Sequence, residues 1–294
     1  MAILTPSDVF VPEVLGDTVI EILYAKTDFL NSGYVADGRV SGGYDQGNTI
    51  KFPKFTADGD LGVQTLPTDA SSVTADKVSM SYDSESVTGA IIAYEWTKAT
   101  MEDAIRAGNV AGFLAEVVAK KYRIEIQRAL LATAAATSLS YTEGGDGFVT
   151  YKGLLAAGIK NWGEYAWDED PLTIMHSKVV FDLLNTDEAK RNLLFGGPGT
   201  VESGKIMRIA GKNIMALDSV PKTGSGASTV YTNIMLRKGG LSLFMKRELD
   251  YNQLPVRNGD AWDMWFTFRY ATHLSKQKPY PAIAYGAKST LDQA

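Results

Sequence analysis

The segment that most constrains the fold is a long β excursion in the first third of the chain. Residues 38–76 are interrupted repeatedly by Gly and Pro, which break regular structure. Within this stretch residues 49–55 predict one strand, and just after it residues 78–83 alternate apolar and polar side chains as a second strand. Pro53 restricts the first strand to a sheet edge or a bulge. Because an isolated hairpin is at best marginally stable in water, this excursion of about forty residues must lie against another surface, and a single subunit offers few candidates.

The clearest helix is predicted over residues 110–136. Asn109 follows a Gly and is a good N-cap. Apolar residues recur at steps of four and seven on one side, and charged residues fill the other side. The expected apolar face holds Phe113, Leu114, Val117, Val118, Tyr122, Ile124 and Leu131, and the expected polar face holds Glu116, Lys120, Arg123, Gln127 and Arg128. About 25 residues give a rod on the order of 37 Å long, well above the usual helix length of roughly 12 residues.

The remainder of the chain alternates helices and strands without a fixed repeat, which indicates an α+β fold. After a Gly-rich break at residues 144–147, Thr150 is expected to cap a helix that runs to Trp162, and Ser177 to cap the next helix. Further strands are predicted at residues 171–175, 212–217, 230–236, 241–245 and 262–271. In the last of these, one face is expected to hold Trp262, Met264, Phe266, Phe268 and Tyr270.

Composition excludes several classes of function. The 294 residues include no Cys and only two His, His176 and His273. Thiolate nucleophiles, disulfides, zinc–thiolate sites and iron–sulfur clusters are therefore ruled out, and little remains for imidazole chemistry. A formal net charge of −5 argues against a dedicated nucleic-acid binder, which needs a basic face. The sequence has neither an apolar run of roughly 18 residues nor a signal-peptide pattern, so we expect no membrane span and synthesis in a cytoplasm.

One motif resembles a nucleotide site. Gly199–Lys205 matches the phosphate-binding pattern G-x-x-x-x-G-K, but Ile206 stands where a Ser or Thr would hold Mg²⁺. The motif should also open a helix, whereas Gly211 soon interrupts any helix after it, so a surface loop is favoured.

Other candidate sites have simpler interpretations. His176 is expected to cap or pack, and His273 has no second His at metal-binding spacing. The acidic residues Asp58 and Asp60, and those at 168–170, lack the spacing of a calcium loop and are expected to be solvated turns. We therefore predict no catalytic, cofactor-binding or metal-binding residue, and no enzyme activity.

Several local patterns resemble one known family, and they occur in that family's order. Asn48–Lys54 resembles the first strand of an extended loop, and Val87–Lys98 resembles the return strand that leads to a long helix. Leu172–Val179 is similar to the strand and helix start of a second domain. Weaker similarities follow at Gly211–Ile214 with Asp218–Pro221, and at Gly239–Leu243. The family is that of the major capsid proteins of tailed bacteriophages, with the Hong Kong 97 type of fold, and the resemblance covers nearly the whole chain.

This resemblance implies a domain organisation. The expected parts are an N-terminal arm and short helix at 1–37, an extended β loop and return strand at 38–90, a peripheral domain at 91–138 and 250–294 with its spine helix at 110–136, and an α/β axial domain at 139–249. The extended loop would lie across a neighbouring subunit, which would supply the surface that an unsupported hairpin needs.

The function implied by the resemblance is self-assembly through hexamers and pentamers into an icosahedral shell that encloses phage double-stranded DNA. The protein would reside in the virion after assembly in the host cytoplasm. Implied partners are other copies of itself, a separate scaffolding protein without cleavage of this chain, a portal, in some members a decoration protein, and DNA held by weak non-specific contact. The candidate inter-subunit contacts are Val9, Phe10 and Val11 on the arm and Ile50, Phe52 and Phe55 on the loop. Packing of these residues within their own subunit stays an open alternative.

Two other functions stay open from the sequence. One is an encapsulin-like nanocompartment, which shares the fold but encloses cargo enzymes. The other is a nucleotide-dependent enzyme that uses the loop Gly199–Lys205.

Overall fold

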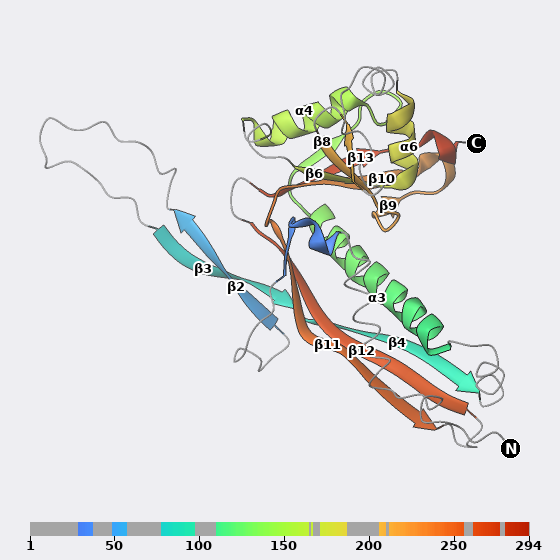
Figure 1. Cartoon of the computed structure of the whole chain (residues 1–294). Coiled ribbons are helices and arrows are strands. Elements are labelled where there is room, and N and C mark those ends of the chain that lie inside the picture. The colour runs from blue at the N-terminus through green and yellow to red at the C-terminus, as the bar shows by residue number, and fades with distance from the viewer. Residues whose placement is uncertain are drawn as a thin grey trace, which may run out of the picture.

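The computed structural model describes residues 29–37, 49–57, 78–97, 110–164, 166, 171–186, 206–209, 212–255, 261–276 and 280–293. The described elements form a body of two stacked layers, each a sheet with its helices, and one two-stranded ribbon projects from the side of this body (Figure 1). Most of the arm and the short helix predicted at 1–37 lie outside the described residues.

Strands dominate the described part of the chain. The helices are α3 (Val110–Ala135), α4 (Tyr151–Trp162) and α6 (Ser177–Asn185), with short 3₁₀ turns η2 (Leu30–Ser32), η3 (Gly226–Ser228) and η4 (Thr290–Asp292). The strands are β1 (Val35–Asp37), β2 (Thr49–Ala57), β3 (Val78–Ser86), β4 (Thr88–Thr97), β5 (Ser140–Thr142), β6 (Leu172–Met175), β7 (Ile206–Ile209), β8 (Lys212–Ala216), β9 (Lys222–Thr223), β10 (Val230–Leu236), β11 (Leu241–Pro255), β12 (Ala261–Leu274) and β13 (Ala282–Ala287).

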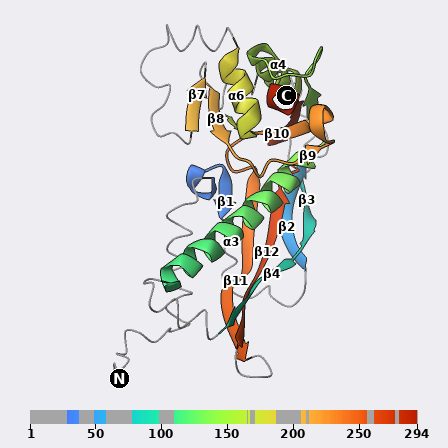
Figure 2. The ribbon, with the colours of Figure 1, turned by 90° about the vertical axis from the view of Figure 1, so that its right-hand side faces the viewer.

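The lower layer is a four-stranded sheet in the order β1-β11-β12-β4, with α3 across one face (Figure 2). The two-residue alternation predicted for β12 is confirmed over the part of its buried face that holds Met264, Phe266, Phe268 and Tyr270. Tyr122 of α3 meets Phe268 edge to face, with ring centroids 4.5 Å apart. The hydroxyls of Thr133 and Thr272 lie 2.7 Å apart and join the helix to the strand.

The helix predicted at 110–136 is confirmed, and its predicted apolar face is confirmed in part, since Val118, Tyr122 and Leu131 are buried. Its buried stripe follows Val118, Tyr122 and Ile126, whereas Ile124 is only partly buried and Gln127, expected on the polar face, is 8% exposed. The cause is the surroundings of the C-terminal half, which contacts β10 and β13 of the upper layer as well as β12. This end of the helix is therefore buried over a wider part of its circumference than one narrow stripe, while Arg128 and Ala132 stay exposed.

The upper layer is a seven-stranded sheet in the order β5-β13-β10-β6-β8-β7, with β9 added beside β10. All four residues of β6 are buried, because both faces of the upper sheet are covered. One face contributes Ile174 and Ile234 to the core around α3. The other face contributes Met175 and Met235 to a second core under α4 and α6. Strands covered on both faces have continuous apolar sequences rather than alternating ones.

Two segments pair with strands that the expected domain boundaries placed in the other domain. Leu241–Met245, grouped with the axial domain, begins β11 and belongs to the lower sheet beside β12. Ala282–Ala287, grouped with the peripheral domain, is β13 and lies between β5 and β10 of the upper sheet. The chain therefore passes from the upper to the lower layer after β10 and returns after β12. Strand β10 pairs with β13, which follows the β11–β12 pair in the sequence.

The helix starts of the upper layer follow ordinary capping rules. The predicted cap at Thr150 is confirmed, since its hydroxyl accepts a hydrogen bond of 2.9 Å from the Gly153 amide. The predicted cap at Ser177 is wrong by one residue: His176 is the N-cap of α6, and its Nδ1 accepts from the Lys178 amide at 3.3 Å. The imidazole can take the place of a hydroxyl here because its ring nitrogen is an acceptor.

The strands predicted at 49–55 and 78–83 are confirmed as β2 and β3. They form a separate two-stranded antiparallel sheet in which Thr49 pairs with Ser86 and Ala57 with Val78. Only Val87 separates β3 from β4, so the ribbon continues directly into the edge strand of the lower sheet. In Figure 1 the ribbon extends away from the body at the left.

Candidate functional site

The root of the ribbon is the place where it meets the body. The Phe52 ring of β2 stacks on the His273 ring of β12, with centroids 4.1 Å apart and planes within 5°. Phe244 of β11 meets the same Phe52 ring edge to face at 4.6 Å. Phe52 is 8% exposed, so an aromatic cluster of three rings closes the root.

One hydrogen bond and one ion pair lie beside these rings. Glu85 Oε1 of β3 is 3.2 Å from Nδ1 of His273, and Asp83 Oδ1 is 3.7 Å from Nζ of Lys276. Phe52 is the register partner of Asp83, and Glu85 lies two residues further along β3, so all three side chains belong to one face of the ribbon. That face is turned toward the body.

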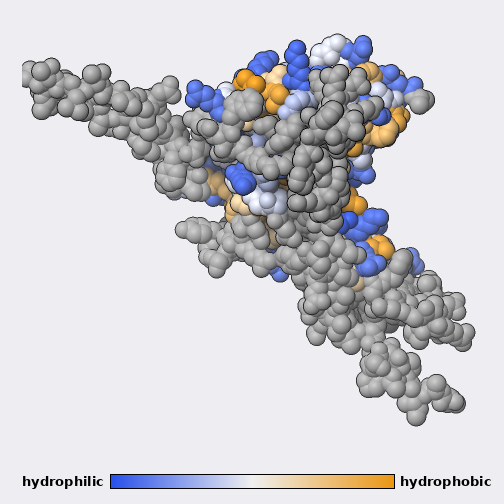
Figure 3. Space-filling model, turned by 45° about the horizontal axis from the view of Figure 1, so that its top comes forward, coloured by the Kyte–Doolittle hydropathy of each residue, from blue (hydrophilic) through white to orange (hydrophobic). Residues whose placement is uncertain are grey.

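The opposite face of the ribbon root is open. Lys51, Ser84 and Tyr82 belong to it by register, and Tyr82 is 58% exposed. In the lower sheet, the face away from α3 also carries exposed apolar side chains, with Ile91 68% and Leu254 57% exposed. On the side of the molecule drawn in Figure 3, by contrast, the described hydrophobic residues are scattered among hydrophilic ones.

The six predicted contact residues differ in their burial and in whether the structure describes them. Ile50 is half-buried in β2, and Phe52 is packed against its own chain, which is the alternative left open above. Phe55 lies in β2 opposite Met80, but its side chain is outside the described part of the structure. The arm residues Val9, Phe10 and Val11 also lie outside the described residues.

No pattern in the sequence indicated the residues that hold the ribbon. His273 and Glu85 are 188 positions apart, and neither lies in a recognisable motif. His273 was expected to lack a metal partner, and its actual partners are a ring and a carboxylate brought together by the pairing of β12 with β4. Such contacts depend on strand order, which a single sequence does not reveal.

A polar cluster at the far end of the upper sheet joins the C-terminal turn to α6. Asp292 accepts hydrogen bonds from the Tyr231 hydroxyl at 2.7 Å and from Lys178. The bond from Lys178 lowers the pKa of Asp292, and the bond from Tyr231 lowers it further. His176 packs on the Tyr231 ring with centroids 4.2 Å apart, and burial lowers the pKa of His176. Each of these four side chains contacts another member of the cluster. The cluster therefore holds the C-terminal turn against α6 and β10, and we call it the C-terminal latch.

A second polar group lies at the start of α4. Glu143 accepts hydrogen bonds from the hydroxyls of Thr150, at 2.7 Å, and Tyr285. Burial raises the pKa of Tyr285 well above its ordinary value, and the bond to Glu143 adds to this effect. The carboxylate therefore fixes the helix start against β13, and the acidic group near a helix N-terminus is electrostatically favourable.

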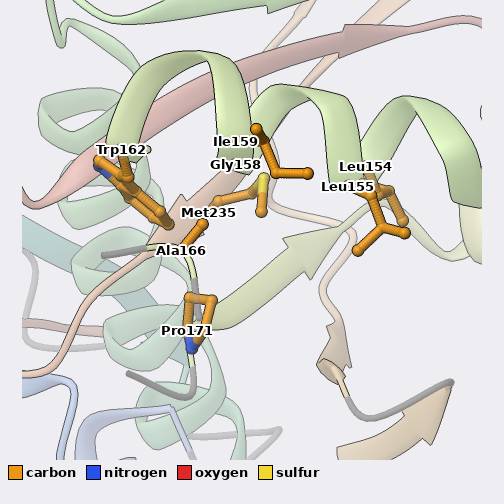
Figure 4. A pocket seen from close by; sticks show the side chains of 8 residues that line it. All are labelled: Leu154, Leu155, Gly158, Ile159, Trp162, Ala166, Pro171 and Met235. Atoms are coloured by element: carbon orange, nitrogen blue, oxygen red, sulfur yellow. The ribbon is translucent and has the colours of Figure 1, made fainter. Parts of the chain in front are cut away.

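An apolar depression lies between α4 and the upper sheet (Figure 4). Its lining includes Leu154, Ile159, Trp162 and Met235, and all the side chains that line it are apolar except for the indole nitrogen of Trp162. That nitrogen donates to the Tyr280 carbonyl at 2.8 Å and is not available to a ligand. Ligand sites ordinarily combine apolar walls with a few polar groups that orient the ligand, and this depression offers none.

The context of the nucleotide-like motif differs from that of a phosphate-binding loop. Gly199–Lys205 is outside the described residues, as are Asp58, Asp60 and residues 168–170. Ile206 begins strand β7, whereas a phosphate-binding loop must lead into a helix whose N-terminus faces the phosphates. Among the described residues no group of three or more His, Asp or Glu is arranged to hold a metal ion. No helix in the described segments is long and apolar enough to cross a bilayer.

Comparison with known proteins gives a consistent result at the level of fold. No protein-family model matches the sequence, and no curated protein matches it. Among solved structures, the capsid of the cyanophage P-SCSP1u is similar with a TM-score of 0.62 and 15% identity over 87% of both chains. The capsid of Ralstonia phage GP4 has a TM-score of 0.61 and 7% identity, again over 87% of both chains.

A third similar structure is a virus-like particle from Pyrococcus furiosus, with a TM-score of 0.55 and 10% identity over 93% of this chain and 98% of that one. At these identities the similarity concerns the fold. The chain has the fold of the major capsid proteins of tailed phages.

Proposed function

We propose that the chain is a shell subunit that assembles through hexamers and pentamers into an icosahedral capsid enclosing phage double-stranded DNA. The observation that carries this proposal is the similarity to phage capsid structures over 87% of the chain, together with a ribbon that leaves the body instead of folding onto it. A two-stranded ribbon needs a further surface for stability, and a neighbouring copy is the partner that this fold suggests.

The contacts would be heterologous, because the ribbon and the surface it meets are different parts of the subunit. Interfaces of this kind close into rings when the rotation between copies is regular. Each contact can be modest, since a subunit held by several neighbours at once benefits from high effective concentration. The open face of the ribbon root, with Lys51, Tyr82 and Ser84, and the exposed Ile91 and Leu254 are the candidate contact residues within the described segments.

Further parts of the proposal rest on the same fold similarity. The peripheral and axial domains correspond to the lower and upper layers, and α3 corresponds to the spine helix. Residues of the arm, including Phe10, would bind neighbouring copies. A scaffolding protein, a portal and a decoration protein are the proposed partners, with the finished protein in the virion.

The proposal is tested by sedimentation and electron microscopy of the purified chain. We expect a megadalton species that appears as closed shells, with DNA protected from nuclease in particles isolated from infected cells. A chain that stays below the mass of a single ring under all assembly conditions would contradict the proposal.

The similarity to the virus-like particle from Pyrococcus furiosus favours a second candidate, a shell that encloses protein cargo. The content of native particles separates the two functions. Nuclease-protected DNA supports the capsid, whereas particles that contain a second protein and lack nucleic acid support the compartment.

A further inference from the structure

The ribbon differs from every other described strand pair in how it is held. β2 and β3 pair with one another and with no other described strand, and Val87 is the short link between β3 and β4. A two-stranded sheet with one such link can pivot at the link, because its outer hydrogen-bonding edges are not tied to the body. Whatever fixes the direction of the ribbon must therefore act at its root.

The rings at the root have the geometry to do this. The Phe52 ring stacks on His273 with centroids 4.1 Å apart and lies nearly perpendicular to Phe244 with centroids 4.6 Å apart. A ring held by one stacked and one perpendicular neighbour is restrained in both rotation and translation. His273 is itself 7% exposed and sits in β12, which is a central strand of the lower sheet, so its position is fixed by the sheet.

Polar contacts restrain the second strand of the ribbon. Glu85 meets His273 at 3.2 Å, and Asp83 meets Lys276 at 3.7 Å. The two carboxylates project from the same face of β3 and reach His273, near the end of β12, and Lys276, two residues beyond that strand. Phe52 restrains β2 while Glu85 and Asp83 restrain β3, so both strands are tied to the same site of the body.

Only one face of the ribbon takes part in these contacts. The other face, which holds Lys51 and Ser84, is exposed at the root. The arrangement thus fixes the direction of the ribbon and still leaves one of its faces accessible to a partner. A ribbon with both faces covered by its own chain would have no face left for a partner.

We infer that the rings of Phe52, Phe244 and His273, with the carboxylates of Glu85 and Asp83, form an anchor that sets the angle at which the ribbon leaves the subunit. This inference rests on the proposed function, because in a shell that angle decides where the ribbon meets the neighbouring copy. Phe52 and His273 are positioning residues: they act on the contact through the ribbon and do not touch the neighbour.

The absence of Cys allows a direct measurement of the angle. Spin labels on Ser84→Cys in the ribbon and Ala132→Cys on the exposed side of α3 report the distance between ribbon and body by pulsed electron paramagnetic resonance. Labelled full-length chain is mixed with a tenfold excess of unlabelled chain, so that only distances within one subunit are recorded. We expect a single narrow distance distribution in the otherwise unchanged chain.

Phe52→Ala and His273→Ala are expected to broaden this distribution at least twofold, in chains whose circular dichroism shows that the body is still folded. Lys51→Ala, on the opposite face of the same strand, and Glu95→Gln, an exposed carboxylate of β4, are the matched controls and should leave the distribution narrow. Glu85→Gln keeps the size of the side chain and removes its charge. Its distance distribution can therefore be measured even if Phe52→Ala impairs folding. We expect it to broaden the distribution less than Phe52→Ala does.

An unchanged distribution in both His273→Ala and Glu85→Gln would overturn the inference, and so would equal broadening in the two controls. These outcomes are separate from those that bear on the proposed function. A chain that never forms shells contradicts the proposed function but still yields the distance. Shells formed in normal yield by Phe52→Ala and His273→Ala would show that the angle of the ribbon does not govern assembly.

Discussion

Two antiparallel strand pairs of the described structure, β11–β12 and β2–β3, differ in their surroundings. β11–β12 is flanked by β1 and β4 and covered by α3, and its residues Phe266 and Phe268 are fully buried. β2–β3 is flanked by no described strand and meets the body through the cluster at Phe52. The first pair buries one face against α3 of the same chain, whereas the second extends away from the body. The comparison separates residues that stabilise the subunit from residues that are available to join subunits.

The largest effect is expected from removing a ring of the covered pair. Phe268→Ala deletes a fully buried ring that meets Tyr122 at 4.5 Å. It should lower the free energy of unfolding by about 3–5 kcal/mol, because the cavity adds to the lost burial. Urea unfolding of the unassembled chain, followed by circular dichroism, measures this loss.

Ile91→Ala in neighbouring β4 is the control for that variant. Its side chain is exposed in the subunit, so the change should stay within about 0.5 kcal/mol. A loss as large for Ile91→Ala as for Phe268→Ala would mean that the sheet face away from α3 is covered within the subunit, and the comparison would fail.

A smaller effect is expected at a helix start of the body. Thr150→Ala removes the hydroxyl that accepts from the Gly153 amide and donates to Glu143. The free energy of unfolding should fall by about 1 kcal/mol, and Thr150→Ser should restore most of it. If Thr150→Ala had no effect and Thr150→Ser also matched the original chain, the cap would contribute nothing to the body.

The smallest effect concerns the C-terminal latch and depends on pH. The pKa of Asp292 is lowered from its ordinary value of 3.8 by its bonds to Lys178 and Tyr231. A carboxyl whose pKa is lower in the folded state contributes stability above its ordinary pKa and loses that contribution as the pH falls through the lowered value. The original chain should therefore lose more stability than Asp292→Asn between pH 5 and the acid limit of folding, at roughly pH 3.

Thermal unfolding at a series of pH values measures this difference. Parallel curves for the two chains over the whole range would show that Asp292 is not stabilised by its partners in the folded state. The ribbon is remote from this latch, so its removal should leave the difference unchanged.

Local patterns in the sequence predicted much of the secondary structure. The alternation Met264, Phe266, Phe268 in β12 and the cap at Thr150 were correct because they depend on neighbours along the chain. The burial of Gln127 in α3 was missed because the C-terminal half of this helix contacts both sheets. The stacking of Phe52 on His273 could not be predicted, because the two residues are more than two hundred positions apart in the sequence. They meet only because β4, which continues the ribbon, pairs with β12.

The most direct test of the central claim shortens the ribbon and keeps its anchor. Pro53 and Tyr82 are register partners, so replacing residues 54–81 with an Asn-Gly turn closes the ribbon just beyond the cluster at Phe52. The original chain and the shortened chain are compared by sedimentation velocity and electron microscopy. We predict that the original chain forms closed shells and that the shortened chain unfolds at the same temperature but does not exceed the mass of a single ring. Closed shells formed by the shortened chain in the same yield would contradict the claim that the ribbon joins the subunits.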